Sequence, residues 1–298
     1  MAGEGPPRQA WVAWIAVCII WGTTYLAIKI ALETIPPFLM GGMRYLMAGA
    51  VLAVFVLARG GVLPDRRNWP RIALIGSFML GLGNGGVVWG AQYLTSGLTA
   101  VLIATSPFWM VSVDAIVTPG QQFHWRHWAG LSVGFGGIVL LVWPDITAGG
   151  AMSRNFGWGV LAVQIACAGW AVGSAFARRD VPPSDVMGAA ALQMIFGGAL
   201  MLAVATSLGE WPGLHWSTRT SIAFAYLTVA GSVVAFTAYA YALRHLDVAI
   251  VSLYTYINPI IAVALGAAIL GEPVGWRMIA AAAVIVAGVV IVGPTRKT

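Results

Sequence analysis

Ten long apolar stretches constrain this 298-residue chain more than any other feature. A helix needs roughly 20 apolar residues to cross a bilayer, and each stretch comes close to that length. Only 9% of the residues are charged, whereas a soluble domain carries roughly 25%. The sequence therefore predicts an all-α membrane protein with ten transmembrane helices. The expected spans are 11–32, 38–58, 71–93, 97–117, 126–143, 156–177, 185–207, 217–243, 249–270 and 275–293.

The basic residues predict how these spans are oriented. If the N-terminus is cytoplasmic, eleven basic residues flank the inner side and three flank the outer side, which is a positive-inside bias. We therefore expect a multi-pass cytoplasmic (inner) membrane protein with both termini in the cytoplasm. The net charge of +6 then reflects topology, and no nucleic-acid partner is expected. The inner residues are Arg8, Arg59, Arg66, Arg67, Arg71, Arg126, Arg178, Arg179, Arg244, Arg296 and Lys297, and the outer ones are Arg154, Arg219 and Arg277.

The chain also repeats itself. Shifted by 149 residues, Cys18-x-x-Trp21 falls on Cys167-x-x-Trp170. This divides the chain into two halves, 9–143 and 156–293, each with five spans. Because five is an odd number, the second half must enter the membrane from the opposite side, which predicts two inverted five-helix repeats. Such repeats are a recurrent design of secondary transporters, with the substrate near the midplane. Further matched pairs are Lys29 with Arg178, "FLMGG" with "DVMGA", and Ser106-Pro107 with Asn258-Pro259.

Three segments carry a resemblance to a known family: "WGTTYLAIKIALETIPPFLMGGMRYL", "YLTSGLTAVLIATSPFW" and "HLDVAIVSLYTYINPIIAVALGAAILGEPVGWRM". They resemble the drug/metabolite transporter superfamily, in its ten-helix EamA-type branch, over nearly the whole chain. The resemblance implies export of small metabolites such as amino acids, and it is nearest to the aromatic amino-acid exporters. One departure is that Glu272 of "LGEP" has Gln121 as its counterpart in the first half.

Polar and aromatic residues inside the spans form the candidate substrate site. We expect Trp21 of "WGTTY" and Trp170 of "WAVGS" to face each other across a midplane cavity, where their rings supply apolar and stacking contact. Hydroxyls and amides would orient the polar head of the solute. Taken singly, each residue is equally compatible with helix packing. The candidates are Trp21, Thr24, Tyr25, Asn84, Trp109, Gln164, Trp170, Ser174, Tyr239, Tyr254 and Asn258.

Four further residues are candidate hinge or gating positions. Gly22 and Gly173 would leave room for the solute beside the tryptophans. Pro107 and Pro259 fall near the middle of matched spans, where proline removes a hydrogen bond and kinks a helix. A static kink is the alternative reading.

Two cations lie within the spans. Lys29 precedes Glu33 by four residues, which favours snorkelling and a local ion pair. Arg44 lies about two turns from a span end, too deep to be left without a partner. Glu33 or a substrate carboxylate could serve Arg44, and the sequence leaves both alternatives open.

Several function classes find no support in the sequence. No cofactor is expected, because metal-ligand spacing and a P-loop are lacking. The G-x-G-x-x-G at 81–86 lies inside an apolar span and is better explained by helix packing. An enzyme would need a nucleophile and a base at depth, and a channel would need a recurring polar stripe or filter. Neither pattern is present.

The sequence thus predicts a secondary transporter that exports small amphiphilic metabolites by alternating access, with amino acids, including aromatic ones, as cargo. The alternative is a broad multidrug exporter of organic cations, because tryptophan and tyrosine rings also bind cations. The expected partners are the small-molecule substrate and the lipid bilayer. A monomer is compatible with the sequence.

Overall fold

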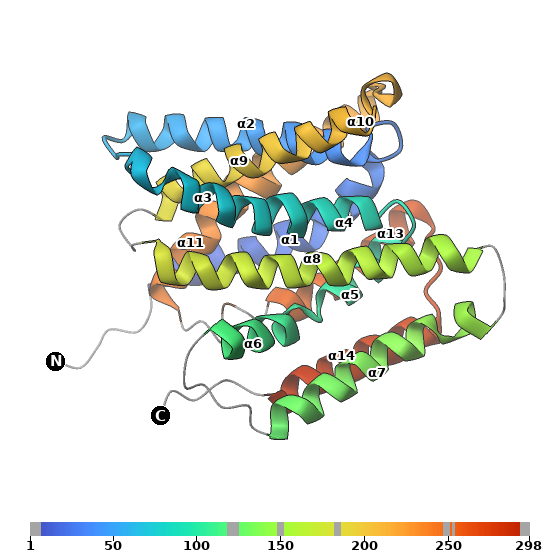
Figure 1. Ribbon diagram of the computed structural model, residues 1–298. Helices are drawn as coiled ribbons and strands as arrows, with labels where there is room; N and C mark the ends of the chain where they lie inside the picture. Colours follow the sequence, from blue (N-terminus) through green and yellow to red (C-terminus); the bar gives the residue numbers. More distant parts are fainter. Residues whose placement is uncertain are drawn as a thin grey trace.

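A computed structural model describes residues 7–117, 125–147, 152–181, 186–246, 251 and 254–292, and in these ranges the secondary structure is helical, without strands (Figure 1). The first half supplies five spans. They are α1 (Arg8–Ala31); α2 (Pro37–Ala58); η1 (Arg66–Asn68), α3 (Trp69–Gly76), η2 (Ser77–Asn84) and α4 (Gly85–Gly90) in one run; α5 (Ser96–Ile103) with α6 (Ser106–Val117); and α7 (Trp125–Thr147).

The second half supplies five more spans. The expected all-helical fold is therefore confirmed, and observed ends differ from the expected ones by a few residues. The largest shift in the first half is the third span, which begins at Arg66 and not at 71. The second-half elements are α8 (Met152–Asp180), α9 (Val186–Ser207), η4 (Trp211–Gly213), α10 (Thr218–Tyr226), η5 (Leu227–Val234), α11 (Ala235–His245), α13 (Tyr254–Leu270) and α14 (Trp276–Val292).

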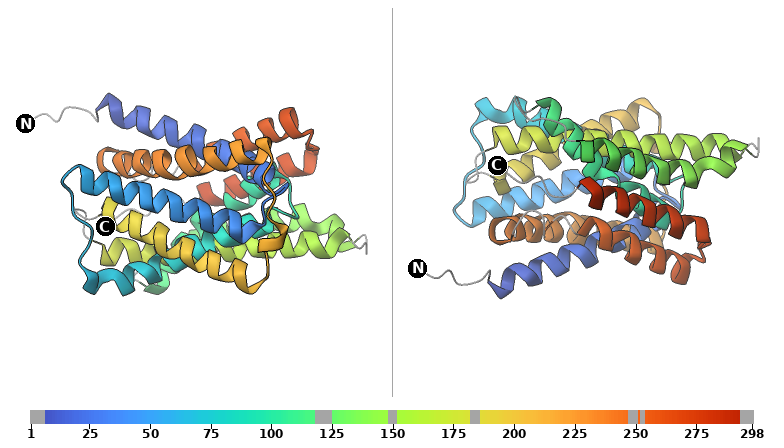
Figure 2. Two further views of the ribbon diagram at one scale, coloured as in Figure 1. Left: turned by 90° about the horizontal axis from the view of Figure 1, so that it is seen from above. Right: turned by 90° about the horizontal axis from the view of Figure 1, so that it is seen from below.

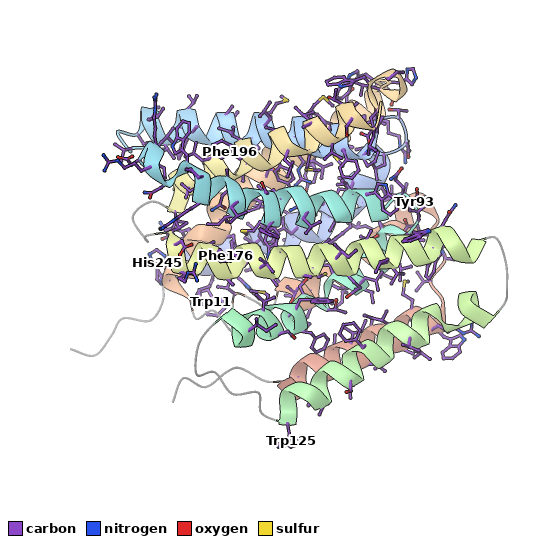
Figure 3. The ribbon with its side chains drawn as sticks, viewed as in Figure 1. Trp11, Tyr93, Trp125, Phe176, Phe196 and His245 are labelled. Atoms are coloured by element: carbon purple, nitrogen blue, oxygen red, sulfur yellow. The ribbon has the colours of Figure 1, made fainter. Side chains whose placement is uncertain are left out.

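The helices are suited to lipid by length and composition. Six of them, among the described residues, are long and apolar enough to cross a membrane. A helix satisfies its own backbone hydrogen bonds, which lipid cannot do. Aromatic residues near the helix ends point outward, as Figure 3 shows for Trp125. Trp125 and Trp276 are 73% and 70% exposed, as expected for an aromatic belt at the interface.

Corresponding helices of the two halves pack on each other. The most extensive contacts join α2 to α9 and α7 to α14, which are the second and fifth spans of each half (Figure 1). The helices also run in opposite directions. Figure 2 shows that α1 begins at the end of the bundle where the N-terminus lies, whereas α8 begins at the other end.

Glycines allow α2 and α9 to approach closely. A Cβ atom at Gly198 would lie 2.7 Å from the Leu46 nitrogen and 2.9 Å from the Gly42 oxygen. A Cβ at Gly49 would lie 2.7 Å from the Ala191 oxygen. Small residues that let backbones touch are a typical basis for helix association in membranes.

The two matched prolines sit in different local structures. Pro107 is the second residue of α6, after a break between Ile103 and Ser106. At the first turn of a helix the missing N–H costs little. Pro259 lies inside the continuous helix α13. The expected position inside a helix therefore applies to Pro259, whereas at Pro107 the span is already broken before the proline.

Both halves contain a π-helical segment at the same place in their third span. These are η2 (Ser77–Asn84) and η5 (Leu227–Val234). The residue after each segment donates its N–H to the carbonyls five and three residues back: Gly85 to Leu80 and Leu82, and Ala235 to Ala230 and Ser232. The carbonyl four residues back, Gly81 or Gly231, loses its usual α-helical donor. Segments of this kind are frequent at functional sites.

The α2–α9 contact predicts a large effect of one added side chain. Gly198→Val should destabilise the protein by about 1–3 kcal/mol, because the new atoms overlap the α2 backbone. Gly136→Val on α7 is the matched control, since nothing lies within 4 Å of a Cβ there. Thermal melting in detergent checks this, and equal melting of the two variants would contradict the packing described.

Candidate functional site

Three aromatic rings pack around Trp21. The Trp21 ring lies 5.5 Å from Phe236, 5.1 Å from Tyr239 and 4.9 Å from Tyr254, centroid to centroid. Tyr239 and Tyr254 are 5.9 Å apart. We call Trp21, Phe236, Tyr239 and Tyr254 the ring cluster. All four rings are only partly buried, so the cluster keeps some accessible surface.

The orientation of Trp21 is fixed by the π-helical segment η5. Its indole Nε1 donates a hydrogen bond of 3.2 Å to the carbonyl of Gly231. That carbonyl is the one whose α-helical donor is redirected within η5. The Trp21 ring therefore points into the bundle, away from lipid, and links the first half to the second.

Trp170 reaches the ring cluster through Phe236. Its ring lies 6.5 Å from the Phe236 ring, so Trp21 and Trp170 both border Phe236. The expected direct apposition of the two tryptophans is replaced by an arrangement with a third ring between them. Phe236 cannot be predicted from the sequence, because an isolated phenylalanine in an apolar span carries no distinguishing signal.

Tyr25 and Asn258 lie beside the ring cluster. Oriented to satisfy its neighbours, the Asn258 amide donates to the carbonyls of Tyr254 and Cys18 at 3.0 and 3.1 Å. Asn258 thus joins α13 to α1, and its amide nitrogen is already engaged with the backbone.

The remaining small polar candidates differ in how fully they are used. The Thr24 hydroxyl donates to the Trp21 carbonyl at 2.6 Å, which is a local bond within its own helix. Ser174 is 9% exposed on α8, one turn beyond Trp170. Asn84, at the end of η2, is partly buried and forms no hydrogen bond among the described residues. Its amide therefore remains available at depth.

Trp109 and Gln164 belong to a separate network. The Gln164 Oε1 accepts bonds from the Trp109 indole at 3.0 Å and from the Thr105 hydroxyl at 3.1 Å. Thr105 stands at the break between α5 and α6. This network stabilises the broken span. The ring contact that Trp109 makes is with Phe135, at 6.0 Å, and not with the ring cluster, as far as the described residues show.

The two candidate glycines lie at close helix contacts. A Cβ at Gly22 would lie 2.9 Å from Ile261 of α13, and one at Gly173 would overlap Met79 of η2. The space expected for a solute is therefore occupied by neighbouring helices at both positions. These two glycines bring neighbouring helices together. The glycines at 81–86 also lie at close helix contacts, as the sequence predicts.

Lys29 binds backbone carbonyls. Its Nζ donates to the oxygens of Ala91 and Leu94 at 2.8 Å and of Gln92 at 3.3 Å. The expected ion pair with Glu33 is not formed, because Glu33 lies 3.2 Å from Arg219. Lys29 thereby satisfies the carbonyls at the end of α4, which lack helical partners.

Glu272 completes this corner of the fold. Its carboxylate accepts bonds from the Ser96 N–H at 2.8 Å, the Ser96 hydroxyl at 2.7 Å and the Gly97 N–H at 3.3 Å. A carboxylate at a helix N-terminus is favourable because it satisfies free N–H groups. The first-half counterpart, Gln121, lies outside the described residues.

Arg44 lies on α2, 3% exposed, facing the same glycine as Trp21. Its Nε donates to the Ser232 hydroxyl at 2.8 Å, and its Cζ lies 4.8 Å from the Tyr45 ring centroid. Among the described residues, no carboxylate pairs with it, and Glu33, the partner considered from the sequence, is engaged with Arg219.

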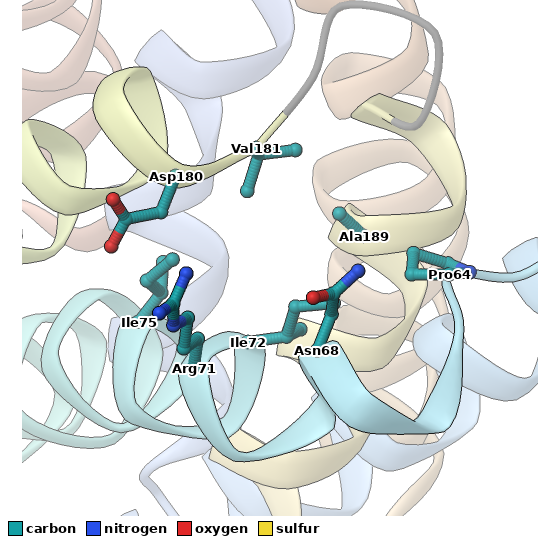
Figure 4. A pocket seen from close by; sticks show the side chains of 8 residues that line it. All are labelled: Pro64, Asn68, Arg71, Ile72, Ile75, Asp180, Val181 and Ala189. Atoms are coloured by element: carbon teal, nitrogen blue, oxygen red, sulfur yellow. The ribbon is translucent and has the colours of Figure 1, made fainter.

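Two hollows open at opposite ends of the bundle. The larger, of about 520 Å³, lies between the 32–37 and 208–215 loops, with Trp89 and Gln92 on its wall. The smaller, shown in Figure 4, measures about 10 Å³ and lies beside Arg71 and Asp180. A cavity of that size holds at most one water molecule, so of these two hollows the larger is the one with room for a small solute.

Of the charged residues at the small hollow, Asp180 lies beyond the apolar part of α8, which covers 155–177, and Arg71 lies near the beginning of the third span. The hydrogen bond from Arg179, 2.8 Å to the Asp180 carboxylate, lowers the pKa of Asp180, and the Arg71 guanidinium adds to this. In Figure 4 the Arg71 and Asp180 side chains point toward each other. No group of three or more His, Cys, Asp or Glu residues in the described part of the chain could hold a metal ion.

The fold and these centres define a multi-pass helical membrane protein whose polar and aromatic groups converge inside the bundle, the arrangement of a transporter. The EamA-like transporter family matches residues 9–143 and again 157–293. The chain belongs to this family, and it is a membrane transporter for a small-molecule substrate.

Individual relatives agree with this assignment. The chain is 36% identical to the inner membrane transporter YedA of Escherichia coli strain K12, over 94% of this chain and 89% of that protein. It is 28% identical to a WAT1-related chloroplastic protein of Arabidopsis thaliana, over 97% of this chain and 70% of that one. A solved crystal structure shares the fold with a TM-score of 0.65 at 22% identity, covering 95% of this chain and 97% of the other.

Proposed function

We propose that this protein exports small amphiphilic metabolites, amino acids and especially aromatic ones, across the cytoplasmic (inner) membrane by alternating access. The observation that carries the proposal is the ring cluster. Trp21 comes from the first half and its three partners come from the second, so a solute between the rings touches both halves at once. Partly buried rings give stacking and apolar contact without a fixed counter-charge.

The repeat supports the mechanism. We infer that residues 9–143 and 156–293 form inverted repeats, in line with the opposite directions of α1 and α8 (Figure 2) and with the packing of α2 on α9 and α7 on α14. In such a pair, exchange of the two conformations opens the midplane site to each side in turn. The break before Pro107 and the proline in α13 are the positions proposed to bend.

An organic-cation exporter is the second candidate. Tryptophan and tyrosine rings attract cations, and the ring cluster has both residue types. Against it stands the buried guanidinium of Arg44, close to the same rings, because a cationic solute would be repelled there. Amino acids, which carry a carboxylate, fit the combination better.

Removal of either tryptophan should weaken transport of aromatic cargo. Trp21→Ala should reduce phenylalanine transport in proteoliposomes about tenfold, since it removes several ring contacts of about 0.5–1.5 kcal/mol each. Trp170→Ala should have a smaller effect in the same direction, because Trp170 reaches the cluster only through Phe236. Trp276→Ala, a lipid-exposed residue, is the matched control. Normal phenylalanine transport by both variants would contradict the proposed cargo site.

The proposed orientation, with both termini in the cytoplasm, can be tested by labelling. In a chain with Cys18→Ala and Cys167→Ala, we expect Gly213→Cys to react with a membrane-impermeant maleimide on intact cells. Val62→Cys should react only after the membrane is opened. Both positions are exposed, Gly213 at the end of the short helix η4 and Val62 in a loop. The reverse pattern would invert the topology.

A further inference from the structure

The two cations inside the spans differ in how their donors are used. Lys29 donates to three carbonyl oxygens, so its three N–H groups are all occupied. Arg44 has five N–H donors, and among the described residues its Nε alone has a hydrogen-bond partner, the Ser232 hydroxyl. Lys29 therefore has a structural role, and Arg44 retains binding capacity.

The Arg44 side chain is held rigidly. The Ser232 hydroxyl donates its own proton to the Leu227 carbonyl at 3.1 Å, so its oxygen can only accept from Arg44. The Tyr45 ring lies against the guanidinium at 4.8 Å, a favourable cation–ring contact. These contacts set the direction in which the Nη groups point.

The Nη groups border accessible space. In the described part of the chain, every fully enclosed side-chain nitrogen or oxygen has a hydrogen-bond partner. The Nη groups have no partner among these residues, so they are not fully enclosed, and they contribute to the 3% of Arg44 that remains exposed. A buried charge without a partner is costly, and an anionic ligand is the partner that would remove this cost.

Gly231 connects Arg44 to the ring cluster. A Cβ atom at Gly231 would lie 3.2 Å from the Arg44 Nη2, and the Gly231 carbonyl accepts from the Trp21 indole. The guanidinium and the aromatic rings thus lie on either side of one residue without a side chain. The counterpart of Arg44 in the second half is Ala191, so the charge occurs once in the protein.

We propose that Arg44 is the anion-binding group of the cargo site, and that its Nη groups bind the carboxylate of a solute whose apolar or aromatic part lies against the ring cluster. This inference rests on the proposed transport function and narrows its substrate class to monocarboxylates with an apolar group. Guanidinium–carboxylate pairs are frequently bidentate, which adds orientation to the charge attraction. Organic cations without a carboxylate are excluded from the site.

Three probes with the same ring test the wild-type protein. Phenylalanine, 3-phenylpropionate and phenethylamine differ in whether they carry a carboxylate. Calorimetry on the purified protein should show that the first two bind and that phenethylamine binds at least about tenfold more weakly. A tenfold loss of affinity is what the loss of one charge-assisted hydrogen bond produces. Equal binding of phenethylamine and 3-phenylpropionate would overturn the proposal without any variant.

Two substitutions assign the effect to Arg44. Arg44→Gln should weaken 3-phenylpropionate binding about tenfold or more, and Arg44→Lys should restore part of it, whereas Arg59→Gln at the exposed end of the same helix should leave it unchanged. Unchanged binding in a folded Arg44→Gln protein would overturn the proposal.

Failure of the anion site and failure of the transport function can be distinguished. Arg44-dependent binding of 3-phenylpropionate without phenylalanine transport would support the anion site and contradict the proposed transport function. Transport of phenylalanine and phenethylamine at equal rates, unaffected by Arg44→Gln, would contradict the anion site and leave the transport function standing.

Discussion

The hydrogen bond from the Trp21 indole to the Gly231 carbonyl is the interaction on which the centre of this protein depends. Within a membrane each polar group needs a protein or water partner. The π-helical segment η5 withdraws the usual donor from the Gly231 carbonyl, and the indole takes its place. This one bond turns Trp21 inward, joins the two halves, and brings the ring to its three aromatic partners.

The same requirement explains the buried charges. Lys29 and Glu272 serve opposite helix ends, the carbonyls after α4 and the N–H groups of α5. These ions are saturated and hold the chain in place. Arg44 is saturated on one side only, by Ser232, and its free side faces the glycine beside Trp21. The charged side chains in this bundle thus differ in how many of their hydrogen-bonding groups are used.

The sequence predicts the ten spans, the repeated halves and the inward role of Trp21, because apolar length and matched pairs such as Cys18-x-x-Trp21 and Cys167-x-x-Trp170 are local signals. It does not predict the π-helical segments, although the paired Gly81 and Gly231 stand at the same place in each half. Phe236 and the partners of Lys29 depend on contacts between distant spans. The same dependence on distant spans explains why the room expected for a solute beside Trp21 is absent: Gly22 meets Ile261 of α13.

We propose that one solute contacts both the ring cluster and Arg44. A structure of the protein in lipid nanodiscs with bound phenylalanine, determined by electron cryomicroscopy, tests this most directly. We expect the phenylalanine carboxylate to lie within hydrogen-bond distance of the Arg44 Nη groups and the phenylalanine ring to pack against Trp21. Phenylalanine bound elsewhere, for example in the hollow between the 32–37 and 208–215 loops, with Arg44 unliganded, would contradict it.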